Sequence, residues 1–464
     1  MMTCLGQAQI YVAGDGNDST GASWATAYTN IQRALDAATN GSMIHVKAGE
    51  YVLARQIDWT NRSVSGVSLR GSYEGVGNPG RQDISRWPTI LRPAAGAGCR
   101  ILYMQDVSNA VLDQFVITGG TATNGITDFN DCGGGVCLFT NREVRIESCC
   151  ISGNLARGAG GGIYMLHTYG AVISNCTIIS NRVDSYADGR NGMGGGIYGR
   201  YSTCSGTLCL VAGNTVRGYP PWGGGAFWYQ GTLTLERTTV SNNWLQGYGY
   251  RQGGGLVCYS AARIHLYNCV VSHNRCEGGT VCRGAGYFTD SCYASTIRNT
   301  LFYMNTADGP SGSQGGALFH YSGYPITIEN CTVVENSPHG LYLSACSGNV
   351  CVTNSILWNN GDDLFDSPDD GTFVLSHNDI KDGDGFGTNG NLSADPMFRR
   401  PQQGDFMLGW YSPCRDIGTN LAWMIPGATD LAGNPRVVPA SGIVDMGAYE
   451  GAPWPKKGTF VSVR

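Results

Sequence analysis

Charged residues are scarce in this chain, and lysine is the scarcest of them. Only 14% of the 464 residues are charged, and four are lysines, so nearly all positive charge is arginine. The formal net charge of −5 excludes a protein that binds nucleic acid mainly through positive charge. No run of about eighteen apolar residues occurs, so the sequence predicts no membrane-spanning helix.

Cysteine and histidine signatures of a metal or catalytic site are also missing. The 18 cysteines contain no CxxC…CxxC or CxxC…HxxxH spacing, and the seven histidines are scattered. We therefore expect no metal bound by cysteine or histidine and can name no Ser-His-Asp triad. Four close cysteine pairs could instead be disulfides in an oxidising compartment. These pairs are Cys132/Cys137, Cys204/Cys209, Cys276/Cys282 and Cys346/Cys351.

Glycine, by contrast, is abundant and periodic. The chain has 69 glycines, and many form clusters that are followed by an apolar or aromatic pair. The clusters return about every 30 residues, a period typical of solenoids. They begin at Gly133, Gly160, Gly194, Gly223, Gly253, Gly284 and Gly315, and fade at His339-Gly340-Leu341.

A second motif, of the type Asn-Cys-Thr-Ile-Ile-Ser-Asn, lies between the glycine clusters. Small residues lie five positions before its last Asn and apolar residues three before, so both share one strand face, which should point inward. The cysteines at the small position should be reduced core residues. The last asparagines should stack as an amide ladder across a strand spacing of about 4.8 Å. They are Asn154, Asn181, Asn214, Asn243, Asn274, Asn305, Asn336 and Asn360.

These repeats predict an all-β fold, a single-stranded right-handed parallel β-helix. Residues 1–9 contain Gly6-Gln7-Ala8, which indicates a signal-peptide remnant or a disordered N-terminus. Residues 10–59 should form an N-terminal cap and first strand, with a short helix after Asn30. Residues 60–390 should be the β-helix, residues 391–452 an irregular C-terminal capping module, and residues 453–464 a tail.

The opening and the tail of the chain also resemble known families. Tyr11-Val-Ala-Gly-Asp-Gly-Asn-Asp18, Ser23-Trp-Ala-Thr-Ala-Tyr28 and Ile44-His-Val-Lys-Ala-Gly-Glu-Tyr51 resemble the start of secreted bacterial β-helix proteins with a pectate-lyase-like fold. Ala394-Asp-Pro-Met-Phe398, Ser412-Pro-Cys-Arg-Asp-Ile-Gly418 and Val444-Asp-Met-Gly-Ala-Tyr-Glu450 resemble the choice-of-anchor Q module. The repeats are similar to the GGAI/FxxN repeats of polymorphic outer-membrane proteins, and Phe302-Tyr-Met-Asn305 matches FxxN. The resemblance implies a secreted or cell-surface protein of the bacterial outer surface.

The resemblance does not supply a catalytic motif. Polygalacturonase-like hydrolases carry NxD, DD, GHG and RxK motifs, but this chain has no RxK, and Pro338-His-Gly340 only approaches GHG. Calcium-dependent pectate lyases use an acidic cluster with a Lys or Arg base, and no lysine lies between Lys47 and Lys381. The catalytic residues therefore remain unknown, and the fold itself does not imply a function.

Acidic residues gather in a few places. Oxygen-rich, glycine-bent loops suit calcium, but a solvated acidic loop is the simpler interpretation, so calcium is possible and no cofactor is required. The residues concerned are Asp362, Asp363, Asp366, Asp369, Asp370, Asp379, Asp382 and Asp384. The pairs Asp128/Asp131 and Asp184/Asp188 could serve acid–base catalysis or cap turns.

The loops between each last Asn and the next glycine cluster are rich in Tyr, Trp, Arg and Asp. Because coils stack in register, these loops should lie together and form a glycan-binding side. Its residues would be Arg182, Asp184, Tyr186, Asp188, Arg190, Arg217, Tyr219, Trp222, Trp244, Tyr248, Tyr250 and Arg251. An outward aromatic column should follow the glycines, either exposed to ligand or covered by loops, at Tyr164, Tyr198, Phe227, Phe288 and Tyr342.

Three functions stay open on this reading. The first is an adhesin-like, monomeric surface protein whose partner is a polysaccharide, another glycan or a neighbouring surface. The second is a polysaccharide lyase or glycoside hydrolase that acts on an acidic glycan. The third is a purely structural surface repeat.

Overall fold

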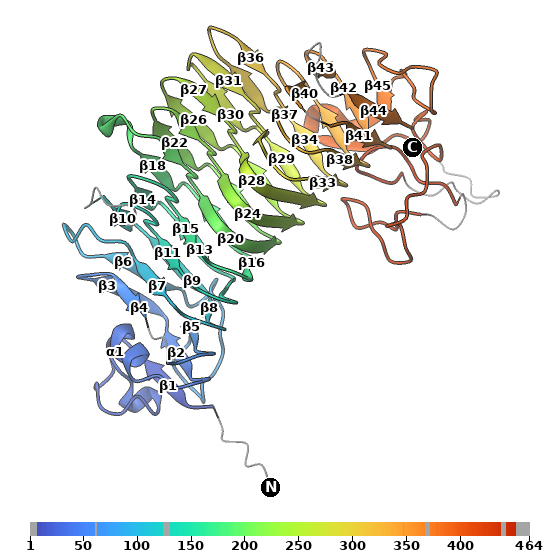
Figure 1. Cartoon of the computed structure of the whole chain (residues 1–464). Coiled ribbons are helices and arrows are strands. Elements are labelled where there is room, and N and C mark those ends of the chain that lie inside the picture. Colours follow the sequence, from blue (N-terminus) through green and yellow to red (C-terminus); the bar gives the residue numbers. More distant parts are fainter. Residues whose placement is uncertain are drawn as a thin grey trace.

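The chain is a long, curved stack of β-coils. The computed structural model describes residues 7–60, 63–123, 130–346, 348–366, 372–437 and 442–451. Its coils pile up from the N-terminal end to the C-terminal end in a crescent, with residues after about 390 on the concave side (Figure 1). The prediction of a right-handed parallel β-helix is confirmed. None of the described helices is long and apolar enough to span a membrane.

Four parallel sheets run along the stack, and we name them A to D. A middle coil passes from β20 in sheet A to β21 in sheet B, β22 in sheet C and β23 in sheet D, and then enters β24 of sheet A. Sheet A contains β1 (Gln9–Val12), β2 (Met43–Lys47), β4 (Ile57–Trp59), β5 (Ser68–Tyr73), β7 (Leu102–Gln105), β8 (Val111–Asp113), β11 (Val136–Phe139), β12 (Arg145–Glu147), β15 (Ile163–Leu166), β16 (Ala171–Ser174), β20 (Ile197–Thr207), β24 (Ala226–Glu236), β28 (Leu256–Tyr267), β32 (Tyr287–Asp290), β33 (Ser295–Arg298), β37 (Leu318–Tyr321), β38 (Ile326–Glu329), β40 (Leu341–Ser344), β41 (Val350–Thr353), β43 (Leu364–Asp366) and β44 (Phe373–Ser376).

The other sheets have shorter strands. Sheet B contains β3 (Gly49–Leu53), β6 (Thr89–Pro93), β9 (Phe115–Thr118), β13 (Cys150–Ser152), β17 (Thr177–Ile179), β21 (Leu210–Ala212), β25 (Thr239–Ser241), β29 (Val270–Ser272), β34 (Leu301–Tyr303), β39 (Thr332–Val334), β42 (Ile356–Trp358) and β45 (Asp379–Ile380). Sheet C contains β10 (Thr121–Ala122), β14 (Leu155–Ala156), β18 (Arg182–Asp184), β22 (Thr215–Gly218), β26 (Trp244–Gly247), β30 (Arg275–Glu277) and β35 (Thr306–Asp308). Sheet D contains β19 (Gly192–Met193), β23 (Pro221–Trp222), β27 (Tyr250–Gln252), β31 (Val281–Arg283) and β36 (Ser313–Gln314).

Alternation along each strand fills the interior. In β20 the side chain of Ile197 points into the core and that of Tyr198 points out, and neighbouring coils repeat this pattern in register. Buried Ile, Val and Leu side chains therefore form one continuous apolar core along the whole solenoid.

The predicted asparagine ladder is confirmed and is continuous from Asn154 to Asn360. Each Nδ2 donates to the Oδ1 of the next asparagine at 2.9 to 3.1 Å. In the middle, Asn243 Nδ2 also donates to Val211 O at 3.0 Å. The ladder ends on a carboxylate, because Asn360 Nδ2 donates to Asp363 Oδ1 at 2.8 Å. The amide groups of the ladder are thus satisfied by their neighbours.

The inward cysteines also behave as predicted. Cys176 Sγ donates to Ile146 O at 3.4 Å, and Cys331 Sγ donates to Ile297 O at 3.6 Å, so the thiols satisfy core carbonyls. The described cysteines form no disulfides with one another. The alternative that the four close pairs form disulfides is therefore wrong. Burial raises the pKa of Cys269 and Cys331 to about 12, so these thiols stay protonated and inert.

Close packing explains the glycine clusters. Gly194 has a φ of +63°, which favours glycine. A Cβ on the next residue, Gly195, would lie 2.5 Å from the carbonyl oxygen of Gly224 in the neighbouring coil. The clusters are thus structural, because only glycine allows the coils to approach at this corner.

Helix α1 (Ile31–Asp36) lies over the first coil, as predicted, and its apolar side joins the core. Asn30 caps it, because Asn30 Oδ1 accepts a hydrogen bond from Gln32 N at 2.7 Å. The single-turn helices η1 (Trp24–Thr26), η2 (Tyr186–Asp188) and η3 (Pro401–Gln403) complete the helical elements of the described residues.

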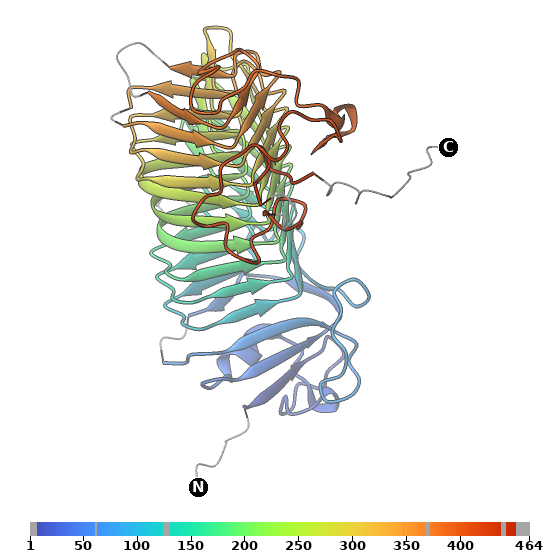
Figure 2. The ribbon, with the colours of Figure 1, turned by 90° about the vertical axis from the view of Figure 1, so that its right-hand side faces the viewer.

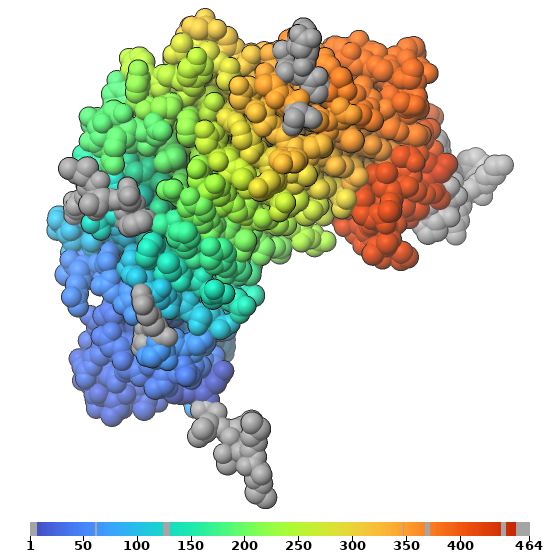
Figure 3. All heavy atoms as spheres, viewed as in Figure 1, coloured from blue at the N-terminus to red at the C-terminus, as the bar shows by residue number. Residues whose placement is uncertain are grey.

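Residues 394–437 and 442–451, which we call the C-terminal module, lie along the outer side of sheet B. The module contains the antiparallel pair β46 (Phe398–Arg400) and β47 (Asp405–Leu408). Phe406 packs against Leu301 and Val334 of sheet B. Figure 2 shows the module in front of the last coils rather than beyond them, and Figure 3 shows it overhanging the hollow side of the crescent.

Candidate functional site

The predicted ligand loops do lie next to one another. They join sheets C and D on the convex rim of the crescent (Figure 1). The register brings Asp184 beside Arg217, and Arg217 beside Gln246. The ring of Tyr186 stacks on that of Tyr248 with centroids 5.9 Å apart, and the Arg217 guanidinium lies 4.6 Å from the Tyr186 ring.

Most charges of these loops are used within the protein. Arg182 is ion-paired with Asp184. Asp188 pairs with Arg157 at 2.8 Å, and Arg190 pairs with Asp131 at 2.6 Å. The carboxylates of Asp131, Asp184 and Asp188 therefore belong to ion pairs, whereas Asp128 lies outside the described residues.

Two further members of the predicted set are structural. Arg251 is buried and donates to Gly247 O, and burial lowers the pKa of its guanidinium. The Trp222 ring packs on Phe227 and Tyr259, with centroid distances of 5.9 and 5.4 Å. The exposed aromatic residues of the loops are Tyr219, Trp244, Tyr248 and Tyr250.

The aromatic column after the glycines is covered. Tyr198, Phe227 and Phe288 are all at most 5% exposed, so the column offers no open aromatic surface along the sheet. Tyr164 and Tyr198 stack with centroids 5.1 Å apart, and Tyr198 and Phe227 with centroids 5.5 Å apart. Of the two alternatives for this column, the structure supports the covered one, because neighbouring rings and loop residues such as Trp222 lie over it.

A different row of side chains is accessible on the outer face of sheet A. It lies two residues further along each strand, and we call it the outer strip. The strip consists of Arg200, Tyr229, Tyr259, Asp290 and Tyr321, which pair in register on successive coils. Arg200 is exposed, and the other four are half-buried. Sequence reasoning missed this row, although the same position after each glycine cluster could have revealed it.

The rings of the strip are held in fixed positions. Tyr229 and Tyr259 are stacked, with centroids 5.9 Å apart and an interplanar angle of 26°. The Arg200 guanidinium lies 5.2 Å from the Tyr229 ring. Burial raises the pKa of Asp290, whose carboxylate accepts a hydrogen bond from Ser291 Oγ at 2.7 Å. The strip therefore combines a flat aromatic surface with a cation and a carboxyl group.

A pocket of about 430 Å³ opens at the N-terminal end of the strip. Arg200 belongs to both, and Tyr164 and Tyr198 form an aromatic wall of the pocket. Arg190 and the buried Asp131 lie on its polar side, joined by their ion pair. The size is typical of small-ligand pockets.

The acidic segment near the C-terminal end does not converge on a cation within the described residues, where no three His, Cys, Asp or Glu side chains form a metal-binding group. Asp363 is buried and accepts hydrogen bonds from Asn360 and from Lys381 N. Asp379 Oδ1 accepts one from Ala394 N at 2.9 Å. Asp369 and Asp370 lie outside the described residues.

Comparison with solved structures finds matches of low similarity. Pectate lyase Pel9A aligns over 96% of this chain and 97% of its own, with 14% identity and a TM-score of 0.49. The A-module of the Azotobacter vinelandii mannuronan C-5 epimerase AlgE6 aligns over 79% and 94%, with 13% identity and a TM-score of 0.40. The catalytic unit of a GH87 α-1,3-glucanase from Streptomyces thermodiastaticus strain HF3-3 aligns over 79% and 65%, with 13% identity and a TM-score of 0.40.

Sequence comparison is more restricted. No curated protein matches the chain. Residues 161–389 match the family model described as a right handed beta helix region, in agreement with the coils seen here.

Proposed function

We propose that this protein is secreted or displayed on the cell surface and binds an acidic polysaccharide along the outer strip. The observation that carries the proposal is the alignment of Tyr229 and Tyr259 beside Arg200 on successive coils. Flat aromatic rings stack on the apolar faces of sugar rings, and a repeat of about 4.8 Å between coils suits an extended chain.

The guanidinium group of Arg200 favours an acidic ligand. Arg200 forms no ion pair with a carboxylate in the described part of the chain, unlike Arg182 and Arg190 of the convex loops. A guanidinium without a carboxylate partner can bind a uronate or sulfate group with two parallel hydrogen bonds. The pocket beside Arg200 would then hold one end of the bound chain.

Affinity electrophoresis through gels that contain uronic-acid, sulfated or neutral polysaccharides, with and without calcium, tests the proposal. We expect retardation by an acidic polysaccharide, and a dissociation constant about fivefold higher for Tyr259→Ala, since an aromatic contact contributes about 1 kcal/mol. Tyr411→Ala is the control, because Tyr411 is 80% exposed in the C-terminal module. An equal rise in the dissociation constant of both variants, or no retardation of the wild type by any acidic polysaccharide, would refute the proposal.

Incubation of the protein in solution with the same polysaccharides, with and without calcium, tests the enzymatic alternative. Unsaturated or new reducing ends would identify a polysaccharide lyase or a glycoside hydrolase in place of a binding protein. The half-buried Asp290 would then be the first residue to replace, because burial raises the pKa of its carboxyl group.

A further inference from the structure

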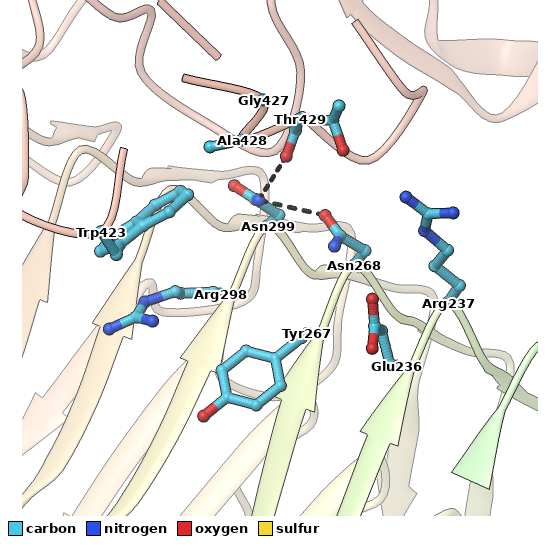
Figure 4. A pocket seen from close by; sticks show the side chains of 10 residues that line it. All are labelled: Glu236, Arg237, Tyr267, Asn268, Arg298, Asn299, Trp423, Gly427, Ala428 and Thr429. Carbon is cyan, nitrogen blue, oxygen red and sulfur yellow. Dashed lines mark hydrogen bonds between the residues drawn. The ribbon is translucent and has the colours of Figure 1, made fainter. Parts of the chain in front are cut away.

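A second pocket lies where the C-terminal module meets the ends of the sheet A strands (Figure 4). Its volume is about 420 Å³. Its floor is made by residues that end β24, β28 and β33, and Gly427–Thr429 of the module lie over it. The outer strip and its pocket are formed by other residues, so the two sites are separate.

Two aromatic rings and a fixed cation shape the pocket. The Arg298 guanidinium lies 5.0 Å from the Trp423 ring and 5.8 Å from the Tyr267 ring. It is also ion-paired with Glu329. Arg298 therefore holds both rings in place, and its charge is already compensated.

The rim carries polar groups that have no such partner. Glu236 and Arg237 are exposed, and neither side chain forms an ion pair within the described residues. Trp423 Nε1 is buried and has no hydrogen-bond partner. A buried donor left unpaired costs about 1 to 3 kcal/mol, which a bound acceptor would recover.

The charges of this pocket balance, whereas Arg200 of the outer strip has no carboxylate partner in the described residues. Glu236 and Glu329 offset Arg237 and Arg298, so no net charge favours an anion. The site between the rings is occupied by Arg298, which disfavours a cationic ligand. Aromatic rings, one carboxylate and an unpaired N–H group together fit the hydroxyl groups and apolar face of a neutral sugar.

We infer that this pocket binds a neutral saccharide of one or two units. The Glu236 carboxylate accepts hydrogen bonds from sugar hydroxyls, Trp423 Nε1 donates to a sugar oxygen, and the sugar packs beside the Tyr267 and Trp423 rings that Arg298 holds in place. The volume falls in the range of about 300 to 1,000 Å³ that is usual for small-molecule sites.

Titration calorimetry of the whole chain with neutral sugars tests the inference. The sugars are methyl glycosides and disaccharides of glucose, galactose, mannose and N-acetylglucosamine. We expect at least one sugar to bind, and its dissociation constant to rise about tenfold or more in Glu236→Gln and in Trp423→Phe. Glu143→Gln, an exposed glutamate on a distant coil, should bind like wild type. Thermal melting checks that each variant is folded.

Two results would overturn the inference. One is that none of these sugars binds, and the other is that binding survives both Glu236→Gln and Trp423→Phe. The double variant Tyr229→Ala/Tyr259→Ala separates this site from the outer strip, since it should keep neutral-sugar binding while losing acidic polysaccharide. Loss of neutral-sugar binding in that variant would place the sugar on the strip instead.

Discussion

Arg436 of the C-terminal module, which is fully buried, donates two hydrogen bonds to Oδ1 of Asn299 in the solenoid, at 3.1 Å from Nε and 2.9 Å from Nη2. Asn299 is the first residue of one copy of the repeat motif that ends at the ladder asparagine Asn305. The same position in the next copies also holds the module, because Asn330 Nδ2 donates to Asp445 O at 3.2 Å and Asn354 Nδ2 donates to Thr419 O at 2.8 Å. The first asparagines of the repeats thus dock the module, and the last ones form the internal ladder.

Replacing Arg436 should therefore loosen the module. Arg436→Met leaves the Glu450 carboxylate buried without its partner, which costs about 3 to 5 kcal/mol. Limited proteolysis should cut the variant within residues 419–451 at concentrations that spare wild type, and the urea midpoint should fall. Arg399→Met is the control, because Arg399 forms an exposed pair in the same module. Wild-type resistance in Arg436→Met would show that the ion pair does not hold the module.

Substitutions in the middle of the asparagine ladder should lower the free energy of unfolding the most. Asn243→Ala removes the acceptor of Asn214 Nδ2 and the donor to Val211 O, so buried polar groups lose their partners. We expect the free energy of unfolding to fall by about 2 to 4 kcal/mol in urea denaturation. The neighbouring Asn242 is exposed with a φ of 55°, and Asn242→Gly should change stability little. Equal effects of the two changes would mean that the ladder adds no stability.

Asp363, which ends the ladder, should make stability depend on pH. Burial raises the pKa of this carboxyl group from 3.8 to about 6, so the folded state binds the proton more tightly than the unfolded chain. The stabilisation that comes from protonation of Asp363 is fully present below pH 4 and is lost as pH rises through about 6. The free energy of unfolding changes by about 3 kcal/mol across this window.

Urea denaturation at several pH values between 3.5 and 7.5 measures this effect as a difference between wild type and Asp363→Asn. The variant cannot titrate at this position, so the stability of wild type should fall relative to it across the window. Asp366→Asn, near the same end of the coil stack, serves as the control. Parallel pH profiles for wild type and Asp363→Asn would contradict the assignment.

Sequence periodicity was sufficient for what repeats on every coil. The spacing of Asn243, Asn274 and Asn305 predicted both the ladder and its inward direction, because each contact is made to the same position one coil away. Tyr198 and Phe227 show what periodicity cannot predict. Their outward direction follows from the repeat, but their burial depends on the residues that lie over them, such as Trp222.

Contacts between segments that lie far apart in the sequence could not be predicted from periodicity. Asn299 and Arg436 are 137 positions apart, and no period links them. The neutral pocket needs Trp423 from the module and Tyr267 from the solenoid, and so it appears only once the module is placed. The outer strip is different, because its register is periodic and only its exposure had to come from the structure.

Hydroxyl-radical footprinting with mass spectrometry tests the central claim most directly, because it reports the accessibility of individual tyrosine side chains. In the presence of the acidic polysaccharide that retards the protein, oxidation of Tyr229, Tyr259 and Tyr321 on the outer strip should slow. Oxidation of the convex-loop residues Tyr219, Tyr248 and Tyr250 should be unchanged. Protection of the loop tyrosines with none on the strip would contradict the account and return the binding site to the convex rim.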